Sequence, residues 1–166
     1  MRTKLLLIAG LLTLTMTAPI LAQDSTNIAG ASFGMLIGPD KPAFGYSVTT
    51  QFSTENLTGP LVTGIEASAF YSDAGWYQGE DKASETYALR SFLVRDITVW
   101  GNFQAGLGLG GWTYLSSSGS DFFNTAVQAR FLYRAWKLYL GLTGDVISVK
   151  GGPDRYFTAF NVNIGI

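Results

Sequence analysis

The chain has 166 residues, of which 11 are Lys or Arg and 12 are Asp or Glu, and 14% of its residues are charged. This length fits one domain with a sizeable core, and the lack of a basic stripe argues against nucleic-acid binding. Cysteine and histidine are both absent, which excludes disulfides, Ser-His-Asp and Cys-His catalysis, and histidine-ligated metals. We therefore predict no catalytic, cofactor-binding or metal-binding residues.

The N-terminus is typical of an export signal. Arg2 and Lys4 precede an apolar run that ends at Ala22, before the polar segment QDSTN. An uncleaved membrane anchor is the alternative, but Pro19 and the small residue at the end of the run favour cleavage. We predict a signal peptide over residues 1–22 and a β-barrel domain over residues 23–166.

The rest of the chain alternates between apolar and polar residues with a period of two, and shows no amphipathic helix. Most alternating segments reach the roughly 9–11 residues that a tilted strand needs to cross a bilayer. The predicted strands are 27–38, 43–53, 61–72, 85–95, 98–115, 124–135, 137–149 and 156–166. After the first pair, long connections alternate with very short ones, at Asp96-Ile97 and Trp136-Lys137. This pattern indicates an up-and-down meander.

The strands have one apolar and one polar face. In the last strand, Tyr156, Phe160 and Val162 lie on one face, whereas Asn161 and Asn163 lie on the other. A barrel can turn its apolar face inward, as in soluble ligand carriers, or outward, as in the outer membrane. Charged residues make up only 14% of the chain, against about 25% in typical soluble domains. This composition favours an apolar exterior.

Isolated charged residues interrupt the polar faces. A barrel would bury them, and because an unpaired buried charge is costly, we expect them to form an ion-pair network in the lumen. The predicted members are Glu66, Arg90, Arg130, Arg134 and Asp145. The alternative is that several of these long side chains reach the rim of the barrel instead.

The segment QAGLGLGGWTY contains Gly106, Gly108 and Gly111 in the G-x-G-x-x-G spacing of a dinucleotide-binding turn. That motif requires a helix after the glycines, whereas here aromatic residues follow. We therefore place Gly106 and Gly108 on the lumen face, where their missing side chains leave room for Arg130. The glycine pair at 110–111 is expected to mark a bulge or bend.

Taken together, the chain resembles the small eight-stranded outer-membrane β-barrels of Gram-negative bacteria, the group that includes the OmpA transmembrane domain and OmpX. The resemblance rests on the export signal, the long alternating strands, the alternating loop lengths and the C-terminal strand YFTAFNVNIGI, which is similar to the family's assembly signal. Ile166 stands where the family commonly has Phe.

The resemblance implies an all-β, eight-stranded, antiparallel up-and-down transmembrane barrel in the bacterial outer membrane. Both termini would be periplasmic, and the longer loops would face outward. It also implies two partners, the outer-membrane lipid and, through the C-terminal strand, the assembly machinery. We expect a monomer.

Three functions stay open. The first, which we predict, is a non-enzymatic barrel with a structural or surface-interaction role through its outer loops. Within residues 73–85, the contact candidates are Trp76, Tyr77, Glu80 and Asp81. The second is a soluble secreted or periplasmic barrel that binds a small apolar ligand. The third is a lipid-modifying barrel enzyme that works without the histidine on which such enzymes rely.

Overall fold

The structure is a computed structural model that describes residues 27–37, 42–53, 64–72, 86–115, 123–149 and 152–166. The predicted signal peptide, residues 1–22, lies outside the described residues. So do the loop candidates Trp76, Tyr77, Glu80 and Asp81. Among the described residues no helix is long and apolar enough to cross a membrane.

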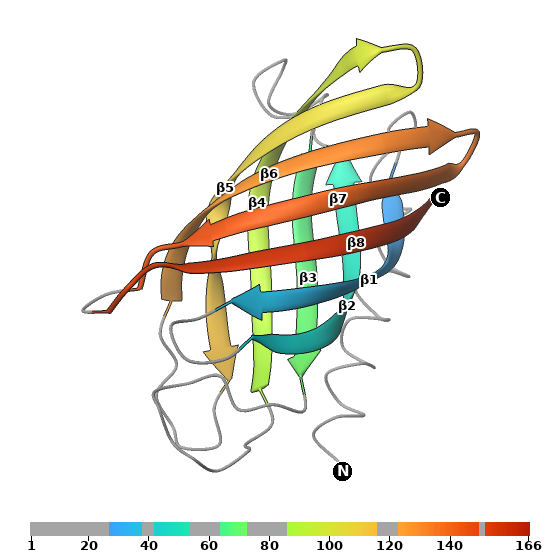
Figure 1. Cartoon of the computed structure of the whole chain (residues 1–166). Helices are drawn as coiled ribbons and strands as arrows, with labels where there is room; N and C mark the ends of the chain where they lie inside the picture. Colours follow the sequence, from blue (N-terminus) through green and yellow to red (C-terminus); the bar gives the residue numbers. More distant parts are fainter. Residues whose placement is uncertain (1–26, 38–41, 54–63, 73–85, 116–122, 150–151) are drawn as a thin grey trace.

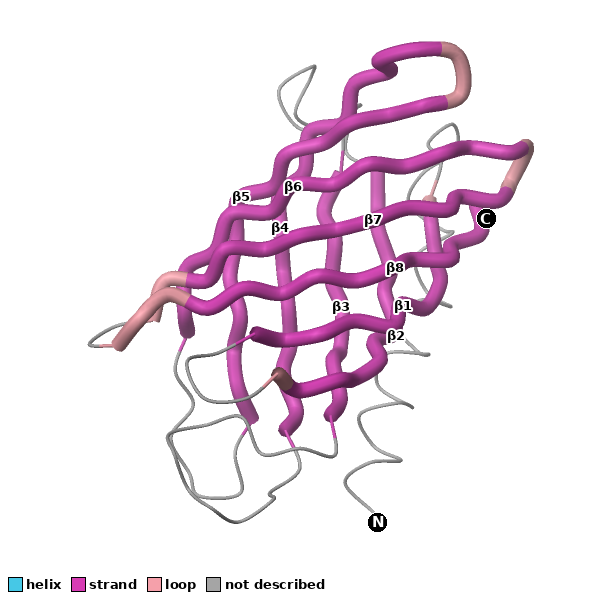
Figure 2. Tube along the Cα trace, viewed as in Figure 1, coloured by secondary structure: helices cyan, strands magenta, loops and turns pink. Residues whose placement is uncertain are grey.

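The described part of the chain forms strands, and Figure 2 shows them as the only regular elements drawn there. Their bounds are β1 (Ile28–Ile37), β2 (Ala43–Ser53), β3 (Gly64–Ser72), β4 (Thr86–Trp100), β5 (Phe103–Leu115), β6 (Phe123–Ala135), β7 (Leu138–Ile147) and β8 (Arg155–Gly165). The long alternating segments of the sequence therefore become the strands of an all-β fold.

Each strand pairs antiparallel with the next one along the chain, and β8 pairs with β1 to close the barrel (Figure 1). At the closure Ile28 lies opposite Gly165, and Ile37 lies opposite Tyr156. Closure leaves no unpaired edge along the barrel wall, which a membrane requires because lipid cannot satisfy free backbone groups. The predicted eight-stranded up-and-down barrel is confirmed.

The two ends of the barrel differ in their connections. The tight turns between β4 and β5 and between β6 and β7 lie at the end where β8 and the chain finish (Figure 1). We call this the turn end. The C-terminal ends of β1, β3, β5 and β7 lie at the opposite end, which we call the loop end.

Side chains alternate between the outer surface and the lumen along most of the barrel wall. In β8, Tyr156 is 51% exposed, Phe160 49% and Ile164 55%, whereas Phe157 is 1% exposed and Asn161 6%. The exposed set is the predicted apolar face, so the apolar side points outward. A soluble barrel would have the opposite arrangement.

The turn between β4 and β5 lies later in the chain than predicted. Asp96 and Ile97, expected to form the link, are instead paired within the sheet with Gly106 and Ala105. The chain reverses at Gly101 and Asn102, and Gly101 has a φ of 53°. Glycine adopts this left-handed backbone without steric cost, which explains why the reversal occurs there.

The glycine pair at 110–111 does not form a bulge. Gly110 pairs with Phe92 and Gly111 with Ser91 in an unbroken register. The register shift between β4 and β5 lies at Thr98/Trp100, beside the tight turn. The expectation of a bulge at the two glycines is therefore wrong.

The lumen is divided along the barrel axis. An apolar cluster fills the part nearer the loop end, and its larger members are Leu36, Phe70, Phe92, Trp112, Tyr114, Ile147 and Phe157. Edge-on aromatic contacts tie it together, with the ring centroids of Trp112 and Phe157 4.9 Å apart and those of Phe70 and Phe157 5.5 Å apart. Polar and charged side chains occupy the rest of the lumen.

Candidate functional site in the barrel lumen

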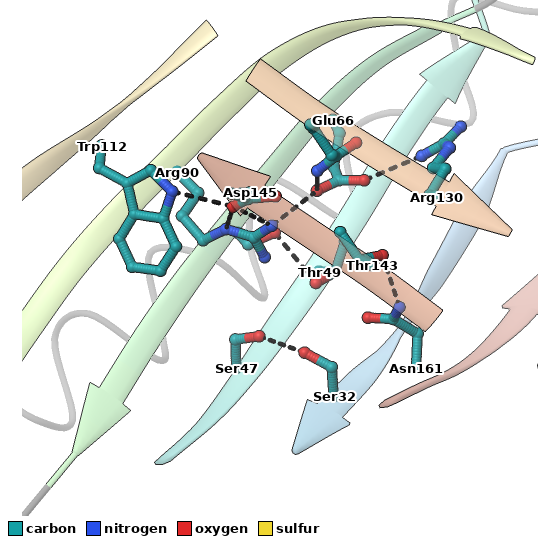
Figure 3. A network of polar contacts seen from close by, with 12 residues as sticks. Ser32, Ser47, Thr49, Glu66, Arg90, Trp112, Arg130, Thr143, Asp145 and Asn161 are labelled. Carbon is teal, nitrogen blue, oxygen red and sulfur yellow. Dashed lines mark hydrogen bonds and ion pairs between the residues drawn. The ribbon is translucent and has the colours of Figure 1, made fainter. Parts of the chain in front are cut away.

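Arg90 and Asp145 meet across the lumen at the border of the apolar cluster (Figure 3). The guanidinium donates from Nε and Nη2 to Asp145 Oδ2 at 3.0 and 2.8 Å. Trp112 Nε1 donates to the same oxygen at 2.9 Å. The guanidinium carbon also lies 4.6 Å from the Phe157 ring centroid and 5.0 Å from that of Trp112. Arg90 is therefore held by one carboxylate and by aromatic faces.

Glu66 and Arg130 extend this cluster toward the turn end. Arg130 Nη1 donates to Glu66 Oε2 at 2.9 Å, and Gln128 Nε2 donates to Glu66 Oε1 at 3.1 Å. Glu66 Oε1 lies 3.8 Å from Arg90 Nη2 and so joins the two halves. Arg130 also contacts Asp96 through two hydrogen bonds, one of them from Nε at 2.7 Å. Each arginine thus has at least two carboxylates near it.

The structure brings together four of the five charged residues predicted for the lumen network, Glu66, Arg90, Arg130 and Asp145. Arg134 is not brought into this cluster. It lies on the same face of β6, but at the strand end, where it is exposed and its Nε donates to the Trp136 carbonyl at 3.2 Å. The expectation that Arg134 joins the network is not met, because the strand has left the lumen by that point.

Asp96 is the charged member of the cluster that the sequence did not predict. Its assignment to a turn concealed it, since a turn residue has no lumen face. Gly101 could have indicated the true position of the turn, since glycine suits a tight turn. With the turn at Gly101, the strand continues through Asp96. The period-two alternation then places Asp96 on the same face as Arg90, Phe92 and Val94.

Gly106 and Gly108 both lie buried on the lumen side of β5. A Cβ atom at Gly106 would meet Asp96 Oδ1 and would lie 3.0 Å from Arg130 Cγ. At Gly108 it would lie 3.1 Å from the Cβ of Gln128. The absent side chain at Gly106 therefore provides the space in which Arg130 and Asp96 pair.

Hydroxyl and amide groups surround the ion pairs on neighbouring strands. Ser32 Oγ and Ser47 Oγ share a short hydrogen bond, and Thr49 Oγ1 and Ser68 Oγ share one at 3.0 Å. Asn161 Nδ2 donates to Thr143 Oγ1 at 2.7 Å (Figure 3). These contacts satisfy buried polar groups between neighbouring strands, as the interior of a lipid-surrounded barrel requires.

A small cavity of about 10 Å³ remains beside these groups. Its polar lining includes Thr49, Gln51, Glu66, Arg130 and Asn163. That volume admits about one water molecule, and no apolar ligand of useful size. The lumen is a packed interior in its described part.

The chemistry of the cluster is that of charge neutralisation. Its carboxylates accept hydrogen bonds from arginine, glutamine and tryptophan side chains. Among the described residues, no group of three or more acidic side chains is arranged to hold a metal ion.

The closed barrel, the outward apolar face and the charged, packed lumen define a transmembrane β-barrel of the outer-membrane type. Comparison with solved structures points to the same class. The chain is similar to Neisserial surface protein A (NspA), with a TM-score of 0.51 and 15% sequence identity over 85% of this chain and 96% of that chain.

Two structures of Ail, the attachment invasion locus protein of Yersinia pestis, also align with the chain. The structure in complex with the heparin analogue sucrose octasulfate gives a TM-score of 0.43 and 14% identity, over 86% of this chain and 98% of that chain. The other gives a TM-score of 0.45 and 10% identity, over 84% and 95%. No protein-family model and no curated protein matches the sequence.

The likeness to NspA is a likeness of fold. The chain therefore has the fold of the small eight-stranded outer-membrane β-barrels. With its exposed apolar belt, this architecture is that of a bacterial outer-membrane protein.

Proposed function

We propose that the protein is a non-enzymatic outer-membrane barrel that acts through its outer loops or as a structural component of the envelope. The observation that carries this proposal is the occupied lumen. Glu66, Arg90, Arg130 and Asp145 are held to one another by ion pairs, and an aromatic cluster fills the part nearer the loop end. A lumen filled in this way offers neither a pore nor a substrate pocket in its described part.

The alternative of a soluble carrier for an apolar ligand requires an apolar interior. The faces that would have to line it, including Phe33, Phe44, Val162 and Ile164, are 43–62% exposed on the outside. Such a large exposed apolar surface needs lipid around it. This distribution supports the membrane barrel over the carrier.

The enzymatic alternative finds no support in the cluster either. The chain has no histidine. Ser32, Ser47 and Ser68 share hydrogen bonds with other hydroxyls, and Ser72 donates to the Phe44 carbonyl, so none of these bonds joins a serine to a general base. We infer that the carboxylates stabilise the barrel and take no part in lipid modification.

The loop between β3 and β4 is our proposed contact surface. It spans residues 73–85 and contains Trp76, Tyr77, Glu80 and Asp81. Aromatic side chains beside carboxylates suit recognition of a partner outside the cell. We also propose that the barrel is a monomer whose C-terminal strand is engaged by the assembly machinery during insertion.

Membrane fractionation with gel mobility compared before and after boiling tests the barrel. We expect the protein in the outer-membrane fraction and a gel mobility that changes on boiling. A closed barrel stays folded in detergent until the sample is boiled. A soluble product with unchanged mobility would overturn the membrane assignment.

Two further measurements separate the functional alternatives. A short epitope inserted between Gly79 and Glu80 should be labelled by antibody on intact cells if the loop faces outward. The mass spectrum of the lipid A fraction should be unchanged when the protein is expressed. A modified lipid in the wild-type strain, absent for Asp145→Asn, would replace this proposal by the enzymatic one.

A further inference from the structure

The tight turn between β6 and β7 has a strained backbone at a bulky residue. Trp136 has a φ of 56°, the only positive φ of a non-glycine residue among those the structure describes. Two-residue hairpin turns of this kind favour Asn or Gly, because a bulky side chain rarely adopts left-handed φ values. Strained residues of this kind cluster at sites that contact ligands.

The indole of Trp136 gains little from the protein itself. It is 85% exposed, the highest value among the large exposed hydrophobic residues. An exposed indole at the end of a membrane barrel is stable at the bilayer surface, where its ring is in the apolar region and its N–H meets headgroups.

Two cations accompany this indole on the same turn. Arg134 donates from Nε to the Trp136 carbonyl at 3.2 Å, and its guanidinium carbon lies 5.6 Å from the Tyr139 ring centroid. Lys137 Nζ lies 5.9 Å from the Trp136 ring centroid. The described ion pairs involve neither cation, and Asp96, the carboxylate on the neighbouring hairpin, is bound by Arg130.

An aromatic run on the outer surface leads from the neighbouring β4–β5 turn to β6, the strand that precedes this turn. Trp100 is 77% exposed and stacks on Phe103 with centroids 6.0 Å apart, and Phe103 lies 5.0 Å from the Tyr133 ring. The Arg134 amide donates to the Asn102 carbonyl at 2.9 Å, which fixes the two hairpins to each other. Arg134 and Lys137 therefore lie at the rim of the turn end, with Arg134 on the lumen-facing side of β6 and the aromatic run on its outer side.

We propose that Arg134 and Lys137, together with the Trp136 indole, bind the phosphate of an anionic phospholipid in the leaflet next to the turn end. The positive charge of the turn complements the phosphate, and the indole inserts beside the acyl chains. This inference rests on the membrane location that the proposed function requires, and it adds a specific lipid class and a specific site.

The test uses the protein purified from membranes in a zwitterionic detergent. Short-chain phosphatidylglycerol and phosphatidylcholine are titrated separately, and bound lipid is measured by native mass spectrometry. We expect a preference for phosphatidylglycerol that weakens about fivefold for each charge removed in Arg134→Gln and Lys137→Gln. Trp136→Gly removes the indole and the backbone strain at this position, and it should weaken the preference for phosphatidylglycerol as well.

Arg95→Gln is the matched control, since it removes an exposed cation from the neighbouring hairpin but not from this turn. It should retain the preference. Equal binding of the two lipids by the wild-type protein, or an equal loss in Arg95→Gln, would overturn the site.

Insertion into phosphatidylcholine vesicles, followed by the change of gel mobility on boiling, is measured in parallel. A protein that inserts but shows no lipid preference disproves this site alone. A protein that does not insert disproves the proposed function, and the site with it.

Discussion

Arg90 and Asp145 form an ion pair across the lumen in which both nitrogens of the guanidinium edge, Nε and Nη2, bond to one carboxylate oxygen. The side chains are 1% and 0% exposed, so neither charge is solvated by bulk water. The pair joins β4 to β7, strands that are not neighbours in the sheet. It therefore acts as a strut through the interior of the barrel.

Asp145→Asn should strongly destabilise the barrel. The substitution keeps the size of the side chain but leaves the Arg90 charge with only Glu66 nearby, at 3.8 Å. Removing one partner of a buried pair costs about 3–5 kcal/mol. Urea unfolding of the protein in vesicles, followed by gel mobility, measures the loss.

The double variant Arg90→Met with Asp145→Leu is the control for this prediction. It removes both charges together, and apolar replacements of a buried pair are often tolerated. We expect it to be more stable than Asp145→Asn. If the single variant unfolds at the same urea concentration as the wild type, the Arg90–Asp145 ion pair does not contribute to the free energy of unfolding.

Arg130→Ala and Arg134→Ala should differ, although both arginines are on the same face of β6. Arg130 is 3% exposed at its side chain and contacts Glu66 and Asp96. Its loss removes the arginine that both carboxylates contact most closely in this cluster, so a destabilisation of about 3–5 kcal/mol is expected. Arg134 is exposed, and its loss should change the unfolding free energy by less than about 1 kcal/mol.

The comparison is made by thermal or urea unfolding of both variants in the same detergent. Equal destabilisation by the two substitutions would mean that Arg134 reaches the lumen cluster in solution, contrary to the structure.

The two faces of each strand could be predicted from the sequence because they follow from the order of neighbouring residues within that strand. In β8, every second residue from Tyr156 to Ile164 is exposed and every intervening one is buried, and this alternation is visible without any knowledge of neighbouring strands. The low charge content then decided which face points outward. Local pattern and composition were sufficient for the fold.

The partners of the lumen charges could not be predicted in the same way. Glu66 and Arg130 are separated by 64 positions, and their contact depends on the register of strands around the whole barrel. A register follows from where the turns lie. Placing the β4–β5 turn at Asp96-Ile97 instead of Gly101-Asn102 removed Asp96 from consideration.

Asp96→Asn tests whether this missed residue stabilises the cluster. Its side chain is 14% exposed and forms two hydrogen bonds with Arg130. Loss of charged hydrogen bonds costs about 1.5–3 kcal/mol, and Arg130 keeps Glu66 as a partner. We expect a smaller loss than in Arg130→Ala, measured by the same unfolding assay.

Asp154→Asn is the corresponding control, because Asp154 is exposed at the loop end. Its substitution should be nearly neutral. An Asp96→Asn variant as stable as this control would show that the Arg130 contact with Asp96 contributes nothing.

Gly106→Ala should destabilise the barrel through the same cluster. The added Cβ would meet Asp96 Oδ1 and would lie 3.0 Å from Arg130 Cγ and Nε, so the ion pair would have to shift. Overpacking of this kind costs about 1–3 kcal/mol. Thermal or urea unfolding measures the loss.

The matched control is Gly144→Ala on β7, where the nearest atom to the new Cβ is the Phe157 carbonyl oxygen at 3.8 Å. That contact is an ordinary one, so the control should fold and unfold as the wild type does.

Combining Gly106→Ala with Asp96→Ala supplies the decisive comparison. The second substitution removes the atom that the Cβ meets. The Gly106→Ala change should therefore cost less unfolding free energy in that background than in the wild type. An equal cost in both backgrounds would show that the glycine is needed for a reason other than room for the Asp96–Arg130 pair.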